Sequence, residues 1–69
     1  MIDYSGVGKR IKSIRKACGA TQKEIAAGLK LSAGYINRLE KGKAKTELEI
    51  LNKIANYFRC DMSWILWGE

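Results

Sequence analysis

The spacing of helix-start signals restricts how this chain can fold more than any other feature. Thr21-Gln22-Lys23-Glu24 has a threonine three residues before a glutamate, the pattern of a capping box at the start of a helix. Ser32 is a second candidate cap shortly downstream, so the first of these helices is short, from Gln22 to Leu29. Only about three residues separate the two helices. The chain therefore contains two short helices joined by a tight turn.

Apolar residues repeat at helical spacing before this pair. Val7, Ile11, Ile14 and Cys18 follow one another at intervals of four, three and four, which places them on one stripe of a helix. Gly19 comes just after this stripe, where glycine commonly ends a helix. We therefore expect a first helix from Val7 whose stripe contributes to the core.

A similar pattern follows the pair. Thr46-Glu47-Leu48-Glu49 is a second candidate capping box, and it opens a helix with a core stripe. This stripe consists of Leu48, Leu51, Ile54, Ala55 and Phe58. Asp61 is a candidate cap for a last short helix, Met62 to Trp67. With no strand-like alternation of useful length, the prediction is an all-α bundle of five helices forming a single domain over residues 1–69.

Composition narrows the classes of function. The chain has no proline and no histidine, it has two cysteines, and 46% of its residues are hydrophobic. A zinc site would need carboxylates beside Cys18 and Cys60, which structural zinc sites rarely use, so we expect no metal and no cofactor. The sequence has neither paired carboxylates nor a glycine-rich phosphate loop, so we do not expect the protein to be an enzyme. Without a signal peptide or a membrane-spanning run, the expected location is cytoplasmic, with both thiols reduced.

Positive charge is concentrated in one part of the chain. Between Lys9 and Lys45 lie 11 Lys or Arg residues and two acids, a net charge of +9, whereas the remaining residues carry a net charge of −3. This asymmetry is typical of a face that binds a polyanion, although a basic surface can also serve solvation alone. Charge by itself leaves both interpretations open.

The tight pair of helices gives the basic segment a more specific interpretation. Two short helices joined by a turn of three or four residues describe a helix-turn-helix, whose second helix lies in the major groove of DNA. The motif would cover approximately residues 22–41, with Ala26 at the helix crossing and with Ile36 and Leu39 inward. Helical hairpins are also common in proteins that do not bind DNA, so this pattern alone does not decide the function.

Several segments together resemble a known family. They are Arg-Ile-Lys-Ser-Ile-Arg-Lys, Thr-Gln-Lys-Glu-Ile-Ala, Ser-Ala-Gly-Tyr-Ile-Asn-Arg-Leu-Glu-Lys-Gly-Lys, Leu-Glu-Ile-Leu-Asn-Lys-Ile-Ala and Trp-Ile-Leu-Trp-Gly. In this order and spacing they resemble the phage-repressor/Cro (XRE-type) helix-turn-helix family over Val7 to Gly68. The resemblance implies a bundle of the lambda-repressor-like type without catalytic activity. It also implies a regulator, expected to be a repressor, that binds a palindromic operator on double-stranded DNA as a homodimer.

The resemblance also implies roles for individual residues. Base readout is expected from Ala33, Gly34, Asn37 and Arg38, because Asn can pair with adenine and Arg with guanine. Phosphate contacts are expected from Gln22, Lys23, Ser32, Tyr35, Lys41, Lys43 and Lys45. Gln22 is also expected to brace the recognition helix. Arg15 and Glu40 match a pair that forms a salt bridge in this family.

The chain departs from the family pattern at two turns. Lys30 and Arg59 occupy positions where glycine is usual and where the backbone tends to be left-handed. Gly34, within the recognition helix, costs up to about 1 kcal/mol relative to alanine. Either that helix becomes firmer on DNA or its backbone approaches the groove closely. With little hydrogen bonding from Ala33 and Gly34, specificity could rest partly on DNA shape.

Two tryptophans in the last predicted helix allow two interpretations. Trp64 and Trp67 can complete the small core, or they can form a self-complementary dimer interface. We expect Trp67 to face outward and Ile65 inward, with a dimer that is weak until DNA is present. An antitoxin, or a protein-interaction or RNA-binding module with the same fold, remains an alternative to a DNA-binding regulator.

Overall fold

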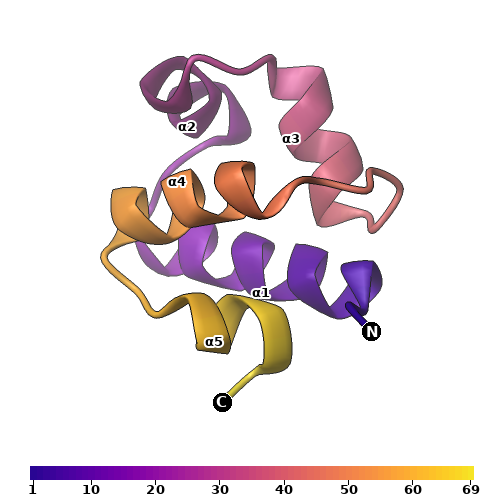
Figure 1. Cartoon of the computed structure of the whole chain (residues 1–69). Coiled ribbons are helices and arrows are strands. Elements are labelled where there is room, and N and C mark those ends of the chain that lie inside the picture. The colour runs from indigo at the N-terminus through magenta and orange to yellow at the C-terminus, as the bar shows by residue number, and fades with distance from the viewer.

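The computed structural model describes all 69 residues and contains five α-helices and no strand. They are α1 (Tyr4–Ala17), α2 (Gln22–Leu29), α3 (Ala33–Glu40), α4 (Leu48–Phe58) and α5 (Met62–Trp67). Figure 1 shows α2 and α3 at the top of the bundle, α5 at the bottom, and α1 and α4 between them. The all-α architecture predicted from the sequence is confirmed.

All five helices contribute to the core. It consists of eleven buried apolar residues: Val7, Ile11, Ile25, Ala26, Leu29, Ile36, Leu39, Leu51, Ile54, Ala55 and Ile65. α1 contacts both α3 and α5, and α2 contacts both α3 and α4. This arrangement places α3 at one end of the bundle, with one face on the core and the other in solvent.

Hydrogen bonds at the helix starts define the helix-turn-helix segment. The Thr21 hydroxyl accepts from the Glu24 amide at 3.0 Å, and the Glu24 carboxylate accepts from the Thr21 amide at 2.8 Å, so the predicted capping box is confirmed. The Ser32 hydroxyl accepts from the Tyr35 amide at 3.0 Å. α2 and α3 therefore begin where the sequence predicts.

The first helix differs from its prediction at both ends. α1 begins at Tyr4 rather than Val7, because the Asp3 carboxylate caps it by accepting from the Ser5 amide at 3.1 Å. Cys18 was expected in the buried stripe, but its side chain is exposed. It lies past the last residue of α1, at the C-cap position.

The prediction of a second capping box, at Thr46, is wrong. Helix α4 begins at Leu48, and no side chain caps its amides. Thr46 is instead buried, and its hydroxyl is hydrogen-bonded to the hydroxyl of Tyr35. Leu48, expected in the core, is 55% exposed because it lies in the first turn of α4, beyond the packed part of the stripe.

The two turns without glycine have the expected left-handed backbone. Lys30 has φ 60° and Arg59 has φ 55°. In α5, Ile65 is fully buried and Trp67 is 51% exposed, as predicted. Asp61 precedes α5 as its N-cap residue, but its side chain makes no capping hydrogen bond. No helix combines the length and the apolar character needed to cross a membrane.

Candidate nucleic-acid interface

The outward face of α3 consists of small and polar side chains. Ala33, Gly34 and Arg38 are exposed and Asn37 is half-buried, whereas Ile36 and Leu39 on the opposite face are fully buried. The two apolar side chains thus anchor the helix in the core. The residues expected to read bases share the free face.

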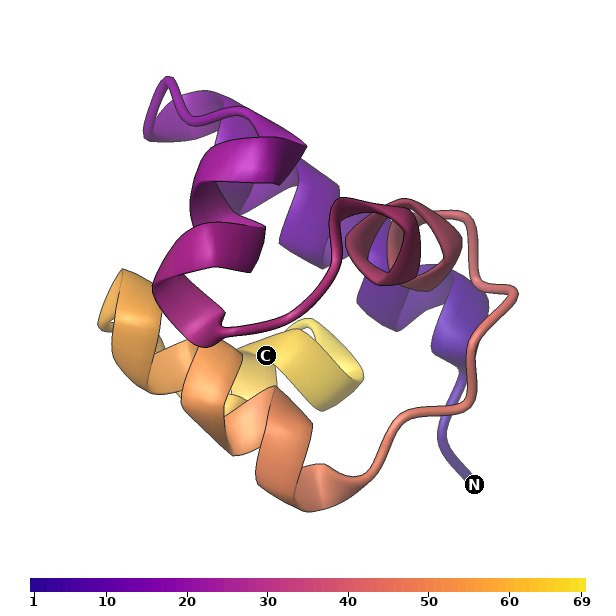
Figure 2. The same ribbon diagram turned by 90° about the horizontal axis from the view of Figure 1, so that it is seen from above.

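Basic residues flank this face. Lys23 at the start of α2 and Lys41, Lys43 and Lys45 after α3 are all exposed. Figure 2, seen from above, shows that the connection from α3 to α4 passes the N-terminal end of α1, and Gly42 in this connection lies against Ser5. The loop lysines are therefore carried by a segment that is packed against the bundle.

The Arg15 and Glu40 side chains form the salt bridge expected from the resemblance. Arg15 Nε donates to Glu40 Oε2 at 2.6 Å and Nη2 donates to Oε1 at 3.0 Å, a bidentate pair. The exposed fractions of these side chains are 11% and 2%. Arg15 Nη1 also donates to the Ala20 carbonyl at 2.9 Å. This pair fixes the end of α3 to α1 and to the turn before α2.

The environment of Glu40 favours its ionised form. Burial alone would raise the pKa of Glu40, but hydrogen bonds from Arg15 and Gln22, together with the positive charges of Arg15 and Lys12, lower it below its usual value. The hydrogen bond to Glu40 raises the pKa of Arg15. The pair is therefore charged at neutral pH.

Gln22 connects Glu40 to the free face of α3. Its Nε2 donates to Glu40 Oε1 at 3.0 Å, and its Oε1 accepts from Asn37 Nδ2 at 3.3 Å. The resemblance implied that Gln22 braces the recognition helix, but not that Asn37 is the residue it contacts. Residues 22 and 37 are far apart in sequence with no periodic relation, so no sequence pattern signals this contact.

Tyr35 and Arg38 interact with each other and with the following loop. The Arg38 guanidinium lies over the Tyr35 ring, 5.9 Å from the ring centroid. The Tyr35 hydroxyl is bonded to Thr46. Tyr35 thus links α3 to the residues that precede α4.

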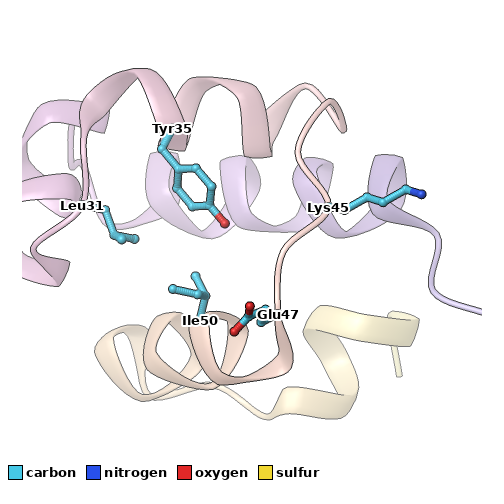
Figure 3. Close-up of a pocket in the computed structure, with 5 residues that line it drawn as sticks. All are labelled: Leu31, Tyr35, Lys45, Glu47 and Ile50. Carbon is cyan, nitrogen blue, oxygen red and sulfur yellow. The ribbon is translucent and has the colours of Figure 1, made fainter.

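An open pocket of about 310 Å³ lies between α3 and the start of α4. Figure 3 shows the Tyr35 ring extending from α3 toward Ile50 and Glu47, with Leu31 on its other side, whereas the Lys45 side chain points away from these residues. Tyr35 and Lys45 are both residues expected to contact phosphates. The pocket is therefore lined by two of the residues predicted to contact phosphates.

The residues expected at a dimer interface lie on the opposite end of the bundle. Trp64 is half-buried and Trp67 is exposed. Arg10 of α1 donates to the carbonyl oxygens of Ile65 at 2.7 Å and Leu66 at 2.8 Å. Arg10 therefore holds the last turn of α5 against α1 and sets the position in which Trp67 is presented.

Known proteins resemble this chain in sequence and in fold. A family model described as Helix-turn-helix matches residues 11–65. The HTH-type transcriptional regulator DicA of Escherichia coli (strain K12) is 30% identical over 63 residues, which cover 91% of this chain and 47% of DicA. The chain thus spans about half the length of this curated relative.

Two solved structures are similar in fold. The restriction-modification controller protein C.AhdI from Aeromonas hydrophila has a TM-score of 0.85 and 23% identity, over 93% of each chain. The clp gene regulator ClgR from Corynebacterium glutamicum has a TM-score of 0.87 and 23% identity, over 94% of this chain and 69% of that chain. The likeness confirms the five-helix fold. Because the family model covers most of the sequence, this chain belongs to the XRE-type helix-turn-helix family.

Proposed function

We propose that the chain is a sequence-specific regulator of transcription that binds double-stranded DNA through α3 in the major groove. The observation that carries this proposal is the free face of α3. It has exposed small residues and a guanidinium, it is flanked by lysines, and its opposite face is anchored in the core. The family membership and the role of DicA as a transcriptional regulator support the same function.

The side chains of this face suit different parts of the groove. Arg38 can donate two hydrogen bonds to guanine, Asn37 can pair with adenine, and the Ala33 methyl can contact a thymine methyl group. A Cβ added at Gly34 would meet one atom within 4 Å outside the helix's own backbone, the Arg38 Nη1 atom at 3.8 Å. Packing within the protein therefore does not require glycine here. A close approach of the α3 backbone to DNA gives a reason for the residue.

The phosphate contacts follow from charge and position. Lys23, Ser32, Lys41, Lys43 and Lys45 are exposed around α3, where they can contact the backbone on both sides of the groove. The second Nε2 hydrogen of Gln22 is free to donate to a phosphate, because each amide nitrogen carries two hydrogens. Tyr35 orients Arg38 and contacts the backbone at the edge of the interface.

We further propose that the protein binds a palindromic operator as a homodimer and acts as a repressor. The exposed Trp67 and its neighbour Trp64 form the apolar contact between the two copies. Binding to a palindrome requires the two copies of α3 to lie about one helical turn apart on the same side of the duplex. A contact through α5 leaves the free face of α3 available in both copies.

The experiment that tests this function is selection from a random duplex library at about 150 mM salt, since affinity for DNA depends steeply on salt. A palindrome with half-sites about one helical turn apart is the expected result. Arg38→Ala should then weaken binding by about 1–3 kcal/mol and relax the preference at one base pair. Equal binding to all duplexes, or none, would reject the proposal and favour a role in protein interaction.

A further inference from the structure

An uninterrupted series of hydrogen bonds connects a buried ion pair to the DNA-facing side of α3. It runs from Arg15 to Glu40, from Glu40 to Gln22 at 3.0 Å, and from Gln22 to Asn37 at 3.3 Å. Its members come from α1, α3 and α2, so it lies where the three helices meet. We refer to these four residues as the amide series.

The charge at one end of the amide series determines the orientation of each amide in it. An ionised carboxylate can only accept hydrogen bonds, so Gln22 must turn its Nε2 toward Glu40. Its Oε1 then points the other way and can only accept, so Asn37 must turn its Nδ2 toward Gln22. The orientation of Asn37 is therefore imposed by a charge two side chains away.

This orientation decides what Asn37 presents to solvent. Its Oδ1 accepts no hydrogen bond within the protein, and no buried side-chain oxygen or nitrogen lacks a partner, so the Oδ1 atom is accessible. One of the two Nδ2 hydrogens is also uncommitted. Asn37 thus has one accessible acceptor and one donor hydrogen that no protein group uses.

We propose that Gln22 and Glu40 are positioning residues that make Asn37 a reader of adenine and not of guanine. The proposal rests on the DNA-binding function proposed above. In the major groove adenine presents an N7 acceptor beside an N6 donor, which complements one donor and one acceptor. Guanine presents N7 and O6, both acceptors, and it would complement Asn37 only with the amide reversed.

The measurement is the ratio of affinities for adenine and guanine at the base pair that Asn37 contacts. That base pair is identified, in the operator selected by the wild-type protein, as the one where Asn37→Ala relaxes the preference. For the wild type, adenine should be preferred by about tenfold, within the range of a bidentate contact. Titrations with matched duplexes that differ only at this position provide the ratio.

Gln22→Met removes the polar connection and keeps the Arg15–Glu40 ion pair, so the protein should fold while the adenine preference falls toward none. A second variant carries Arg15→Met and Glu40→Leu together, which replaces the buried pair by apolar side chains and releases Gln22 to rotate. It should lose the preference in the same way. Circular dichroism confirms that each variant is folded before the titrations.

Lys43→Ala is the matched control, because loss of an exposed lysine should weaken binding to both duplexes equally and leave their ratio unchanged. The inference is overturned if folded Gln22→Met keeps the wild-type ratio, if the wild type prefers guanine at this position, or if Asn37→Ala relaxes no position. Selection of no duplex at all would instead reject the proposed function, and the adenine reading with it.

Discussion

The α2–α3 motif and the α4–α5 segment are attached to α1 by different kinds of contact. A buried, bidentate ion pair between Arg15 and Glu40 holds α3, and side chains cap the starts of both α2 and α3. No side chain caps α4 or α5, and Arg10 holds α5 through backbone carbonyls. Polar side-chain contacts are thus concentrated in the α2–α3 motif, which carries the proposed interface. In the α4–α5 segment, apolar packing is supplemented only by hydrogen bonds to backbone carbonyls.

The largest effect should come from breaking the ion pair at one side. Arg15→Met or Glu40→Leu alone leaves a buried unpaired charge and should lower the free energy of unfolding by about 3–5 kcal/mol, whereas the double substitution should cost much less. Arg10→Met in the other half removes hydrogen bonds to helix-end carbonyls and should cost about 1–3 kcal/mol. Urea denaturation followed by circular dichroism measures all four. An Arg10 variant less stable than either single ion-pair variant would reverse the comparison.

Acid should weaken the α2–α3 attachment before it affects apolar packing in α4–α5. The folded state lowers the pKa of Glu40, so its contribution to stability is fully present above the usual glutamate pKa of about 4.3 and is lost as the pH falls through the folded value. Unfolding free energies measured at a series of pH values should therefore decline in this acidic range. In the Arg15→Met, Glu40→Leu double variant, the unfolding free energy should decline less steeply with falling pH than in the wild type. An equally steep decline in this variant would mean that other carboxylates cause the effect.

An intermediate effect is expected at the opposite end of the bundle, on assembly rather than folding. Trp67→Glu should weaken dimerisation by about tenfold or more, since tryptophans often dominate the energy of interfaces. The fold should remain, because Trp67 is half exposed. Tyr57→Glu is the control, since Tyr57 is similarly exposed, at 44%, but lies on α4. Sedimentation equilibrium distinguishes the two, and equal weakening by both would remove α5 as the proposed interface.

The two Thr-X-X-Glu segments allow a sharper comparison at about 1 kcal/mol. Thr21→Ala should cost about that much and should increase amide hydrogen exchange at Glu24, because the threonine caps α2. Thr46→Ala should have a comparable cost through the loss of its bond to Tyr35. Exchange in the first turn of α4 should stay unchanged. Faster exchange at that turn would mean that Thr46 supports α4 after all.

The smallest effects should occur at the two left-handed turns. Lys30 ends α2 and Arg59 ends α4, and both residues have positive φ. The substitutions are Lys30→Gly and Arg59→Gly. Glycine removes a steric cost of about 1–2 kcal/mol but adds freedom to the unfolded chain, so each change should stabilise by no more than about 1 kcal/mol. Melting temperatures of the two variants measure the gain. A loss in either would indicate that the lysine or arginine side chain makes a stabilising contact.

Local signals predicted the five helices because the position of most helix starts and ends depends on residues within one or two turns of the boundary. The box at Thr21 and the cap at Ser32 act on amides three residues away, and the structure contains both. The same signal failed at Thr46, because a hydroxyl from another helix competes for the side chain and burial favours that partner. The start of α1 was missed because Asp3 precedes the apolar repeat by several residues.

The candidate site was predictable only in outline. The resemblance indicated which residues occupy the free face of α3 and suggested the Arg15–Glu40 pair, which the structure contains. The contact between Gln22 and Asn37 depends on how α2 and α3 cross. The orientation of the Gln22 amide depends in addition on Glu40, which pairs with Arg15 of α1. Geometry of this kind arises from packing and has no counterpart in the spacing of residues along the chain. The base and phosphate contacts themselves stay predictions.

The close approach of α1 and α3 at Gly8 restricts which residues can replace this glycine. A Cβ at this position would be 2.3 Å from the Leu39 carbonyl oxygen and 2.7 Å from that of Glu40, both rigid backbone atoms. Any larger residue must push the end of the recognition helix away from the scaffold. A larger residue at position 8 should therefore disturb the junction of α1 and α3, whereas Gly34, on the outer face of α3, has room for a Cβ.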